Sequence, residues 1–186
     1  MSNFDFGQPD GAMCQLAFIV EDLHAAIKRY TREFNAGPWF VMEQVDIRNA
    51  TYRGQPTSFR GSLASGNSGH LQIELIQQVD DTPSVFTETI KARGYGMHHI
   101  GVAVHDFDAW MKKYEAAGYE VALYCETDIP NRNAYLDTRG ELPYFVEVIE
   151  MNAGTERIFT SVYRPSIGWN GEDPIRSFGT FHAPKM

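Results

Sequence analysis

Four polar side chains lie in the middle of segments that otherwise read as apolar strands, and together they could hold a metal ion. They are Gln15 in QLAFIV, Glu74 in QIELI, His99 in HIGVAV and Glu147 in FVEVI. Oxygen and imidazole donors in this combination suit a divalent first-row ion such as Co, Ni, Zn, Mn or Fe, with coordination positions left for water or substrate. A carboxylate inside a buried strand is costly unless it has such a partner.

Each of these residues also has an ordinary explanation. Glu74 and Glu147 could be solvated residues on the outward face of an antiparallel sheet. A lone histidine in a strand is more often a hydrogen-bonded core residue than a metal ligand, and Gln15 alone carries no weight. Repetition favours a site, because the same strand positions are polar in both halves of the chain.

An internal repeat organises the chain. QLAFIVEDL at residues 15–23 matches HIGVAVHDF at residues 99–107, an offset of 99 − 15 = 84 residues. In each copy a β-rich apolar run is followed by an aspartate, Asp22 or Asp106, where a helix N-cap belongs. The residues that follow have apolar positions at helical spacing. Each copy is therefore predicted to begin with a strand and a helix.

The remainder of each half is rich in strand-forming residues. Gly37 and Gly118 are predicted to end the two helices, and the last strands match as residues 72–76 and 145–149. The offset there is 147 − 74 = 73 residues, so the first half carries eleven extra residues, which we assign to a loop at 48–56. Each half therefore reads as a βαβββ module.

Strand alternation places the four polar residues on one surface, because alternate side chains face opposite sides of a sheet. Gln15 and His99 share their face with small residues, which leaves room for something else. His98 falls on the side predicted to pack under a helix and is interpreted as structural. That side carries the large apolar residues Leu16, Phe18, Val20, Ile100, Val102 and Val104. One short module buries too little alone, so the two should pair and bring the four polar residues together.

Composition excludes several classes of protein. The 186 residues have a net charge of −8, whereas nucleic-acid and anionic-membrane binders are usually basic. The sequence has no run of about 18 apolar residues, and its first residues do not resemble a signal peptide, so we expect a cytoplasmic protein. Cys14 and Cys125 lie far apart, which predicts neither a disulfide framework nor a thiolate metal site.

Four segments are predicted along the chain: a first module at 13–80, a linker helix at 81–95, a second module at 96–152 and an aromatic-rich extension at 153–186. The linker helix should begin at a cap, Thr82 or Ser84, and end near Arg93. The extension shows neither helical nor strand periodicity. It could cover the cavity between the modules, strap a second subunit or pack on the outer sheet.

The segment GYGMHHIGVAVHDFDAW at 94–110 is similar to the start of the second module in methylmalonyl-CoA epimerases, and the closing strands IELIQ and VEVIE add support. Over residues 13–152 the chain resembles the vicinal oxygen chelate superfamily, which includes glyoxalase I, methylmalonyl-CoA epimerase, extradiol dioxygenases and bleomycin-resistance proteins. The resemblance implies an α+β fold in which two paired βαβββ modules form a cup-shaped mixed sheet around a divalent metal ion.

By position, the resemblance implies Gln15, Glu74, His99 and Glu147 as the metal ligands. This ligand set is like that of glyoxalase I, whereas the central segment is like that of the epimerases. The substrate therefore stays open between a CoA thioester, a glutathione adduct and an aromatic ketone. Arg48, in the region of the long loop, could meet a substrate carboxylate or CoA phosphates, as could Arg53 and Arg60, but ordinary solvated arginines are the favoured interpretation of all three.

Members of the superfamily coordinate neighbouring oxygens of a substrate and so stabilise an enolate or a related anion. The implied activity is proton transfer next to a carbonyl of a small molecule, by an epimerase, isomerase or glyoxalase-type lyase. Glu147 is the first choice for the base and Glu74 the second, and a homodimer is expected. The alternatives are a non-catalytic small-molecule binding or resistance protein and an extradiol dioxygenase, which needs two histidines and a carboxylate where this sequence offers only His99 and one glutamate.

Overall fold

The computed structural model describes residues 3–45, 47–127 and 131–178. The first half contains β1 (Met13–Ile19), α1 (Leu23–Phe34), β2 (Trp39–Met42), β3 (Ile47–Tyr52), β4 (Gln55–Pro56), β5 (Gly61–Ser68) and β6 (Leu71–Gln78). After α2 (Val85–Arg93), the second half contains β7 (Gly96–Val104), α3 (Phe107–Ala116), β8 (Val121–Thr127), β9 (Arg132–Leu136) and β10 (Phe145–Glu150). The extension contains α4 (Ala153–Tyr163), a 3-10 turn (Arg164–Ser166) and β11 (Ile175–Ser177).

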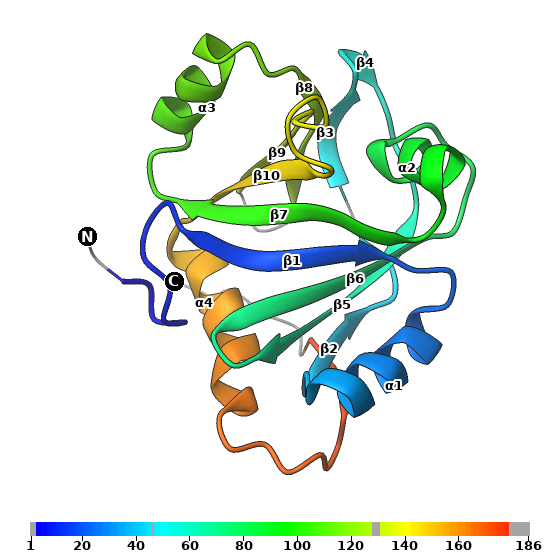
Figure 1. Ribbon diagram of the computed structural model, residues 1–186. Helices are drawn as coiled ribbons and strands as arrows, with labels where there is room; N and C mark the ends of the chain where they lie inside the picture. Colours follow the sequence, from blue (N-terminus) through cyan, green and yellow to red (C-terminus); the bar gives the residue numbers. More distant parts are fainter. Residues whose placement is uncertain (1–2, 46, 128–130, 179–186) are drawn as a thin grey trace.

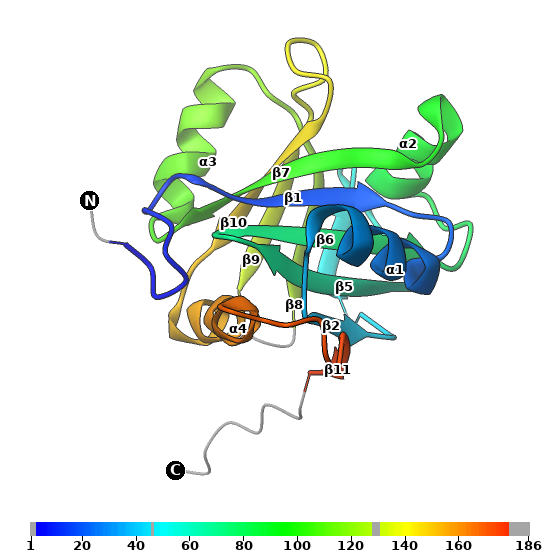
Figure 2. The same ribbon diagram turned by 60° about the horizontal axis from the view of Figure 1, so that its bottom comes forward.

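The strands form one curled mixed sheet in the order β11-β2-β5-β6-β1-β7-β10-β9-β8-β3-β4 (Figures 1 and 2). At its centre β1 pairs with β6 in parallel and with β7 antiparallel, while β7 pairs with β10 in parallel. The first and last strands of both halves are therefore neighbours, and the sheet curves around the surface that they share. The α+β fold with a cup-shaped mixed sheet, expected from the sequence, is confirmed.

Helices α1 and α3 pack on the outer face of the sheet, as the apolar pattern predicted. Leu23 and Ile27 of α1 contact a cluster that includes Leu16 and Phe18 of β1, and Phe107 of α3 lies in an equivalent cluster over β7 and β10. Burying these apolar stripes supplies the main driving force for holding helix against sheet. The inner face is thereby left for the site.

Helix caps follow the predicted residues at the N-termini but not at the end of α1. Asp22 and Asp106 accept hydrogen bonds from the backbone N–H groups of Ala25 and Ala109, which satisfies one of the free amides in each first turn. The prediction that Gly37 ends α1 is wrong. Asn35 takes the left-handed conformation at the C-cap, with φ 50°, and asparagine is the side chain that most often replaces glycine there.

The segment at 48–56 is not the loop that the sequence predicted. It forms the β3–β4 hairpin, which crosses from the first half and pairs with β8 of the second, with Ile47 opposite Thr127 and Tyr52 opposite Leu123. Arg53, expected to be solvated or to meet a ligand, instead forms ion pairs with Glu88, Glu120 and Asp137. These contacts fasten the hairpin to α2 and to the second half.

The extension also differs from the prediction that it lacks regular structure. Asn152 caps α4, its side chain accepting from the N–H groups of Gly154 and Thr155, and β11 adds a parallel strand to the edge of β2. The aromatic rings of Phe6, near the N-terminus, and Phe159 of α4 lie 5.2 Å apart. Residues 179–186, which complete the predicted extension, lie outside the described residues. Within the described ranges, no helix has the length and apolar character needed to cross a membrane.

Candidate metal centre

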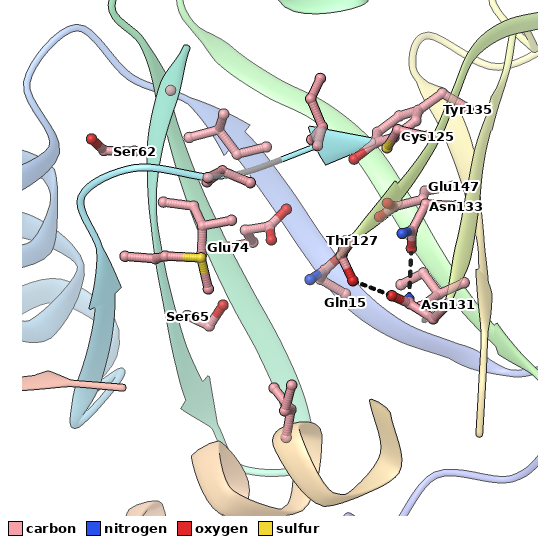
Figure 3. Close-up of a pocket in the computed structure, with 18 of the residues that line it drawn as sticks. Gln15, Ser62, Ser65, Glu74, Cys125, Thr127, Asn131, Asn133, Tyr135 and Glu147 are labelled. Carbon is pink, nitrogen blue, oxygen red and sulfur yellow. Dashed lines mark hydrogen bonds between the residues drawn. The ribbon is translucent and has the colours of Figure 1, made fainter. Parts of the chain in front are cut away.

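Strand register brings the predicted ligands into two adjacent rows across the four central strands. The first row contains Gln72, Gln15, Gly101 and Glu147, and the second contains Glu74, Ala17, His99 and Phe145. Residues two apart on one strand point to the same side, so both rows face the interior of the cup. Figure 3 shows Glu74 on β6 and Glu147 on β10 pointing into the cavity from opposite sides, with Gln15 of β1 between them.

Glu74, His99 and Glu147 form a compact cluster. One ligand atom from each lies within 4.8 Å of the others, a spacing at which the three could share one ion. Nε2 of His99 is 3.0 Å from Oε2 of Glu147 and 3.6 Å from Oε2 of Glu74. Nε2 nevertheless has no hydrogen-bond partner among the described residues. This nitrogen therefore lies close to both carboxylates without a partner of its own.

Gln15 approaches the same space from β1. Its Nε2 donates to Oε1 of Gln72 at 2.7 Å, while its own Oε1 is buried and has no partner. Gly101 makes room for this side chain, since a Cβ built there would lie 2.8 Å from Oε1 of Gln15. The small residue that the sequence pattern singled out on this face therefore accommodates a predicted ligand.

A chain of hydrogen bonds fixes which nitrogen of His99 is available. Nε2 of His98 lies 3.2 Å from the backbone oxygen of Val85, which can only accept, so His98 carries its proton on Nε2. Nδ1 of His98 then accepts from Nδ1–H of His99, 2.8 Å away. The proton of neutral His99 is thereby held on Nδ1, and Nε2 presents a lone pair to the cluster. Orientation of a ligating histidine by a partner on its other nitrogen is typical of metal sites.

Burial sets the protonation of this cluster. It lowers the pKa of His99 to about 3 and holds that of His98 well below its usual range, so both imidazoles are neutral near pH 7. Burial and the charge of Glu147 raise the pKa of Glu74 well above its usual range. Burial likewise raises the pKa of Glu147 to about 7, against the opposing effect of a hydrogen bond from the Tyr135 hydroxyl.

The donor set fits a divalent cation. Two buried acceptor atoms, Nε2 of His99 and Oε1 of Gln15, lack partners, and a buried polar atom left in that state is costly. Two carboxylates with raised pKa values lie beside them, and a cation would stabilise their charged forms. One imidazole and three oxygen donors leave further positions open in the six-coordinate geometry that Mn, Fe, Co and Ni commonly adopt.

A cavity of about 320 Å³ opens above the cluster. Its walls come from the inner face of the sheet, from the segment that connects β2 with β3, and from α4, through Thr155, Ile158 and Phe159. Phe178, which follows β11, also lines it, and its ring lies 5.5 Å from that of Phe40. Of the three roles considered for the extension, these contacts support covering of the cavity.

Sequence reasoning missed several polar residues of the site. Tyr135 lies opposite Glu147 on the neighbouring strand β9 and donates to it. Gln72, two residues before Glu74, holds the amide of Gln15. The alternation of β6 could have found Gln72, since it shares a face with Glu74; nothing in the sequence links Tyr135 with Glu147, because their pairing is set by register. His98, interpreted as structural, does pack between the rings of Phe86 and Phe145, and it also bonds His99.

Comparisons with known proteins place this architecture. No curated protein matches the sequence significantly. Among solved structures, methylmalonyl-CoA epimerase from Mycobacterium tuberculosis is 19% identical with a TM-score of 0.54, over 79% of this chain and 91% of that chain. A hypothetical protein from Bacillus halodurans C-125 is 16% identical with a TM-score of 0.57, over 77% and 96%. Streptomyces coelicolor methylmalonyl-CoA epimerase in complex with 2-nitronate-propionyl-CoA is 16% identical with a TM-score of 0.53, over 78% and 100%.

At these identities the likeness to solved structures concerns the fold. The sequence itself gives a more direct assignment, because a model of the Glyoxalase/Bleomycin resistance protein/Dioxygenase superfamily matches residues 14–134, well over half of the chain. The resemblance inferred from the repeat and the 94–110 segment is confirmed. The chain belongs to the glyoxalase/bleomycin resistance protein/dioxygenase superfamily, also called the vicinal oxygen chelate superfamily.

Proposed function

We propose that this protein is a metal-dependent enzyme that transfers a proton on the carbon next to a carbonyl group of a small molecule, as an epimerase, isomerase or glyoxalase-type lyase does. One observation carries the proposal: the half-buried carboxylate of Glu74 and the buried carboxylate of Glu147 flank an unpartnered histidine nitrogen at the base of a cavity. Such a site combines the groups needed to hold a cation with the groups needed to move a proton.

Gln15, Glu74, His99 and Glu147 are the proposed ligands, in keeping with the partnerless atoms and the donor types of the cluster. A divalent cation bound there would polarise a carbonyl oxygen and lower the pKa of the adjacent C–H group. His98 keeps the lone pair of His99 directed into the site. Which of Co, Ni, Zn, Mn or Fe the protein uses is a matter for metal analysis.

The two glutamates are the proposed acid and base, one removing the proton and the other returning it. Tyr135 lies opposite Glu147 on β9, and a hydrogen bond from its hydroxyl acts to lower the pKa of Glu147. Glu74 is the more accessible of the pair, its side chain 12% exposed against 7% for Glu147, and within the described residues we find no hydrogen-bond donor to its carboxylate. The sequence ranked Glu147 first as the base; the freer position of Glu74 supports testing both on equal terms.

The test measures metal content and proton exchange. Purified protein is loaded separately with each of the five metals, and deuterium uptake next to the carbonyl of α-hydroxy ketones is followed by NMR in heavy water. We expect exchange with at least one metal and its loss in Glu74→Gln, Glu147→Gln or both, with the fold retained. Glu43→Gln, at a side chain 70% exposed, is the matched control and should exchange normally. Undiminished exchange in both site variants would remove these carboxylates from the mechanism.

A binding or resistance protein without catalysis is the second candidate, and the enclosed cavity supports it. Metal-free protein that binds an aromatic compound tightly, together with no proton exchange under any loading condition, would favour this alternative. A homodimer in the cytoplasm also stays a prediction, which analytical ultracentrifugation and cell fractionation would test.

A further inference from the structure

We infer that the cavity selects uncharged, mainly apolar carbonyl compounds and rejects anionic ones, including CoA thioesters and glutathione adducts. The inference takes its reaction from the proposed function and adds the substrate class. It stands on the charge, the polarity and the enclosure of the walls.

The walls carry no positive side chain that could receive an anion. Among the described residues that line the cavity there is no lysine or arginine, and Glu74 and Glu147 are the only acidic groups. Arg60, adjacent to the lining residue Gly61, pairs with Asp80 and is 78% exposed. Burying an anion without a cationic partner or hydrogen bonds is costly.

The cluster at the base of the cavity offers no compensating charge. Two carboxylates balance the charge of a divalent cation, and without a cation any ionised carboxylate makes the site negative. Cys125, which also faces the cavity, stays a neutral thiol because burial raises its pKa to about 12. The cluster is therefore neutral with a divalent cation and negative without one, so it supplies no net positive charge to an anionic group elsewhere on the ligand.

The remaining walls are suited to an apolar body. Large apolar side chains surround the space, among them Phe59, Ile76, Phe86, Leu123 and Ile158. Contact with such side chains favours a ligand through burial of its apolar surface, by about 25 cal/mol for each Å² removed from water. A hydrated, charged group would instead lose water here without replacement.

Neutral polar groups lie along one wall, where they could recognise an uncharged oxygen. Thr127 and Asn133 both interact with Asn131, whose Nδ2 donates to Oδ1 of Asn133 at 3.3 Å. The side-chain amide of Asn133 is directed into the cavity (Figure 3). An amide of this kind can donate to a carbonyl or hydroxyl oxygen without requiring that the ligand be charged.

Enclosure limits the size of the ligand. The chain connecting β2 with β3 crosses one side of the cup, with Gln44, Val45 and Ile47 on the lining, and α4 closes another side. The cavity of about 320 Å³ is at the small end of the range for ligand sites. The part of a ligand held inside it matches one ring or a short branched chain, so the body of a CoA ester would have to lie outside the cavity.

Binding of a matched series tests the inference: 2-hydroxyacetophenone, its 4-carboxylate, the methyl ester of that carboxylate, and propionyl-CoA. Affinities are measured by isothermal titration calorimetry with the metal-loaded protein and with the chelator-treated protein. We expect the parent ketone and the ester to bind alike and the carboxylate and propionyl-CoA to bind at least about 10-fold more weakly. The ester controls for size. Binding of the carboxylate or of propionyl-CoA as tightly as the neutral compounds would overturn the inference.

A cation introduced into the wall gives a second, positive test. Met42, half-buried on β2, lines the cavity, and its replacement in Met42→Lys keeps a long flexible side chain while adding a charge. This variant should bind the 4-carboxylate about 10-fold more tightly than the unmodified protein does. Met42→Gln, neutral and of similar length, should not. If the Met42→Lys variant still binds the neutral ketone but binds the 4-carboxylate no more tightly than the unmodified protein does, the result would count against the inference.

These experiments separate the substrate class from the reaction. Selective binding of neutral ketones with no proton exchange in any of them would leave the substrate class standing and contradict the proposed function. Proton exchange in propionyl-CoA but not in the neutral ketones would support the reaction and overturn the substrate class.

Discussion

At the scale of single residues, His98 decides how His99 can act. Its side chain is fully buried and donates a hydrogen bond from Nε2 to the backbone oxygen of Val85. Its Nδ1 accepts a hydrogen bond from Nδ1–H of His99, which keeps that proton off Nε2 of His99. Without that acceptor, His99 could place its proton on either nitrogen, and only one arrangement offers a lone pair to a cation.

We therefore predict that His98→Phe weakens metal binding by about 10- to 100-fold, the usual effect of losing such a supporting contact. Phenylalanine keeps an aromatic ring between Phe86 and Phe145, so the fold should be retained. Calorimetric titration with Co and Ni measures the change, and His105→Phe, at a half-exposed ring, is the control. Unaltered affinity in His98→Phe would contradict the role assigned to this residue.

Gly101 acts on the site through the space it leaves empty. A Cβ there would lie 2.8 Å from Oε1 of Gln15 and 2.9 Å from Cδ1 of Ile149, so Gly101→Ala should displace Gln15. We expect weaker metal binding in this variant, with no further loss when Gln15→Ala is added. Gly140→Ala, where a Cβ meets open space, should bind metal normally. Additive losses in the double variant would show that Gly101 does not act through Gln15.

At the scale of secondary-structure elements, the hairpin β3–β4 depends on one side chain. The guanidinium of Arg53 bonds Glu88 of α2, Glu120 before β8 and Asp137 after β9, and Arg139 bridges two of the same carboxylates. Backbone pairing already joins β3 to β8 and β8 to β9, and these side-chain contacts attach α2 to them. Arg139 and Arg53 together hold the pKa values of Asp137 and Glu88 below their usual range.

Replacing Arg53 should destabilise the protein in a pH-dependent manner. At pH 7 we expect Arg53→Met to lower the free energy of unfolding by about 1–2 kcal/mol, a moderate value because the network is partly exposed. Carboxyls with depressed pKa values stabilise the fold above their ordinary values near 4 and lose that contribution as the pH falls. The difference between variant and parent should therefore shrink at pH 3.

Urea unfolding at pH 7 and pH 3 measures the two differences. Arg60→Met is the matched control, because Arg60 is 78% exposed and, within the described residues, pairs only with Asp80. Its loss should change stability by less than about 0.5 kcal/mol. If Arg53→Met lowers the free energy of unfolding equally at both pH values, the ionised carboxylates are not the source of the stability that Arg53 contributes.

The hairpin also shows where sequence reasoning reaches its limit. Asp22 and Asp106, the strands around Gln15 and His99, and the helix capped by Ser84 were predictable because caps and two-residue alternation act within a few positions. The partner of β3 was not predictable, because β8 lies far along the chain. In addition, a segment that contains Asn49 and Gly54 suits a loop as well as a hairpin. Turn residues are common to both structures.

The same contrast holds for the site. The face of each ligand candidate followed from alternation, and the repeat indicated that the first and last strands of the halves meet. The contact of Tyr135 with Glu147 depends on the register of β9, and the bond from His98 to His99 depends on the position of α2, neither of which has a local signal. The helical character of α4 was hidden because polar residues, Thr155 and Thr160, lie on its buried side.

At the scale of the whole molecule, the proposed metal site would couple cation binding to stability. In metal-free protein, a carboxyl whose pKa is higher in the folded than in the unfolded chain destabilises the fold as the pH rises above its ordinary value of 4.5 and through the folded value. His98 and His99 have the opposite sign, but they contribute no further change above their ordinary value of 6.5. Between pH 6.5 and 8.5, Glu74 and Glu147 therefore set the trend within this cluster.

We predict that the melting temperature of chelator-treated protein falls from pH 6.5 to 8.5 and that metal loading restores it by an amount that grows with pH, because the cation takes the place of the protons. Differential scanning calorimetry at both pH values measures the difference in melting temperature between metal-loaded and chelator-treated protein. The variant with Glu74→Gln and Glu147→Gln together should lack the decline. A difference in melting temperature that becomes smaller as the pH rises would contradict the predicted coupling.

The crossing of β3 to the far edge of the sheet has a consequence for how the chain reaches its native state. Its partners in β8 are separated from it by about 70 to 80 positions, so this wall of the cup cannot form until most of the second half has been synthesised and ordered. During translation the first half would emerge with an incomplete edge, and its polar interior would meet bulk water. The four proposed ligands share this dependence, because His99 and Glu147 belong to the second half and can join Gln15 and Glu74 only after β7 and β10 have been made.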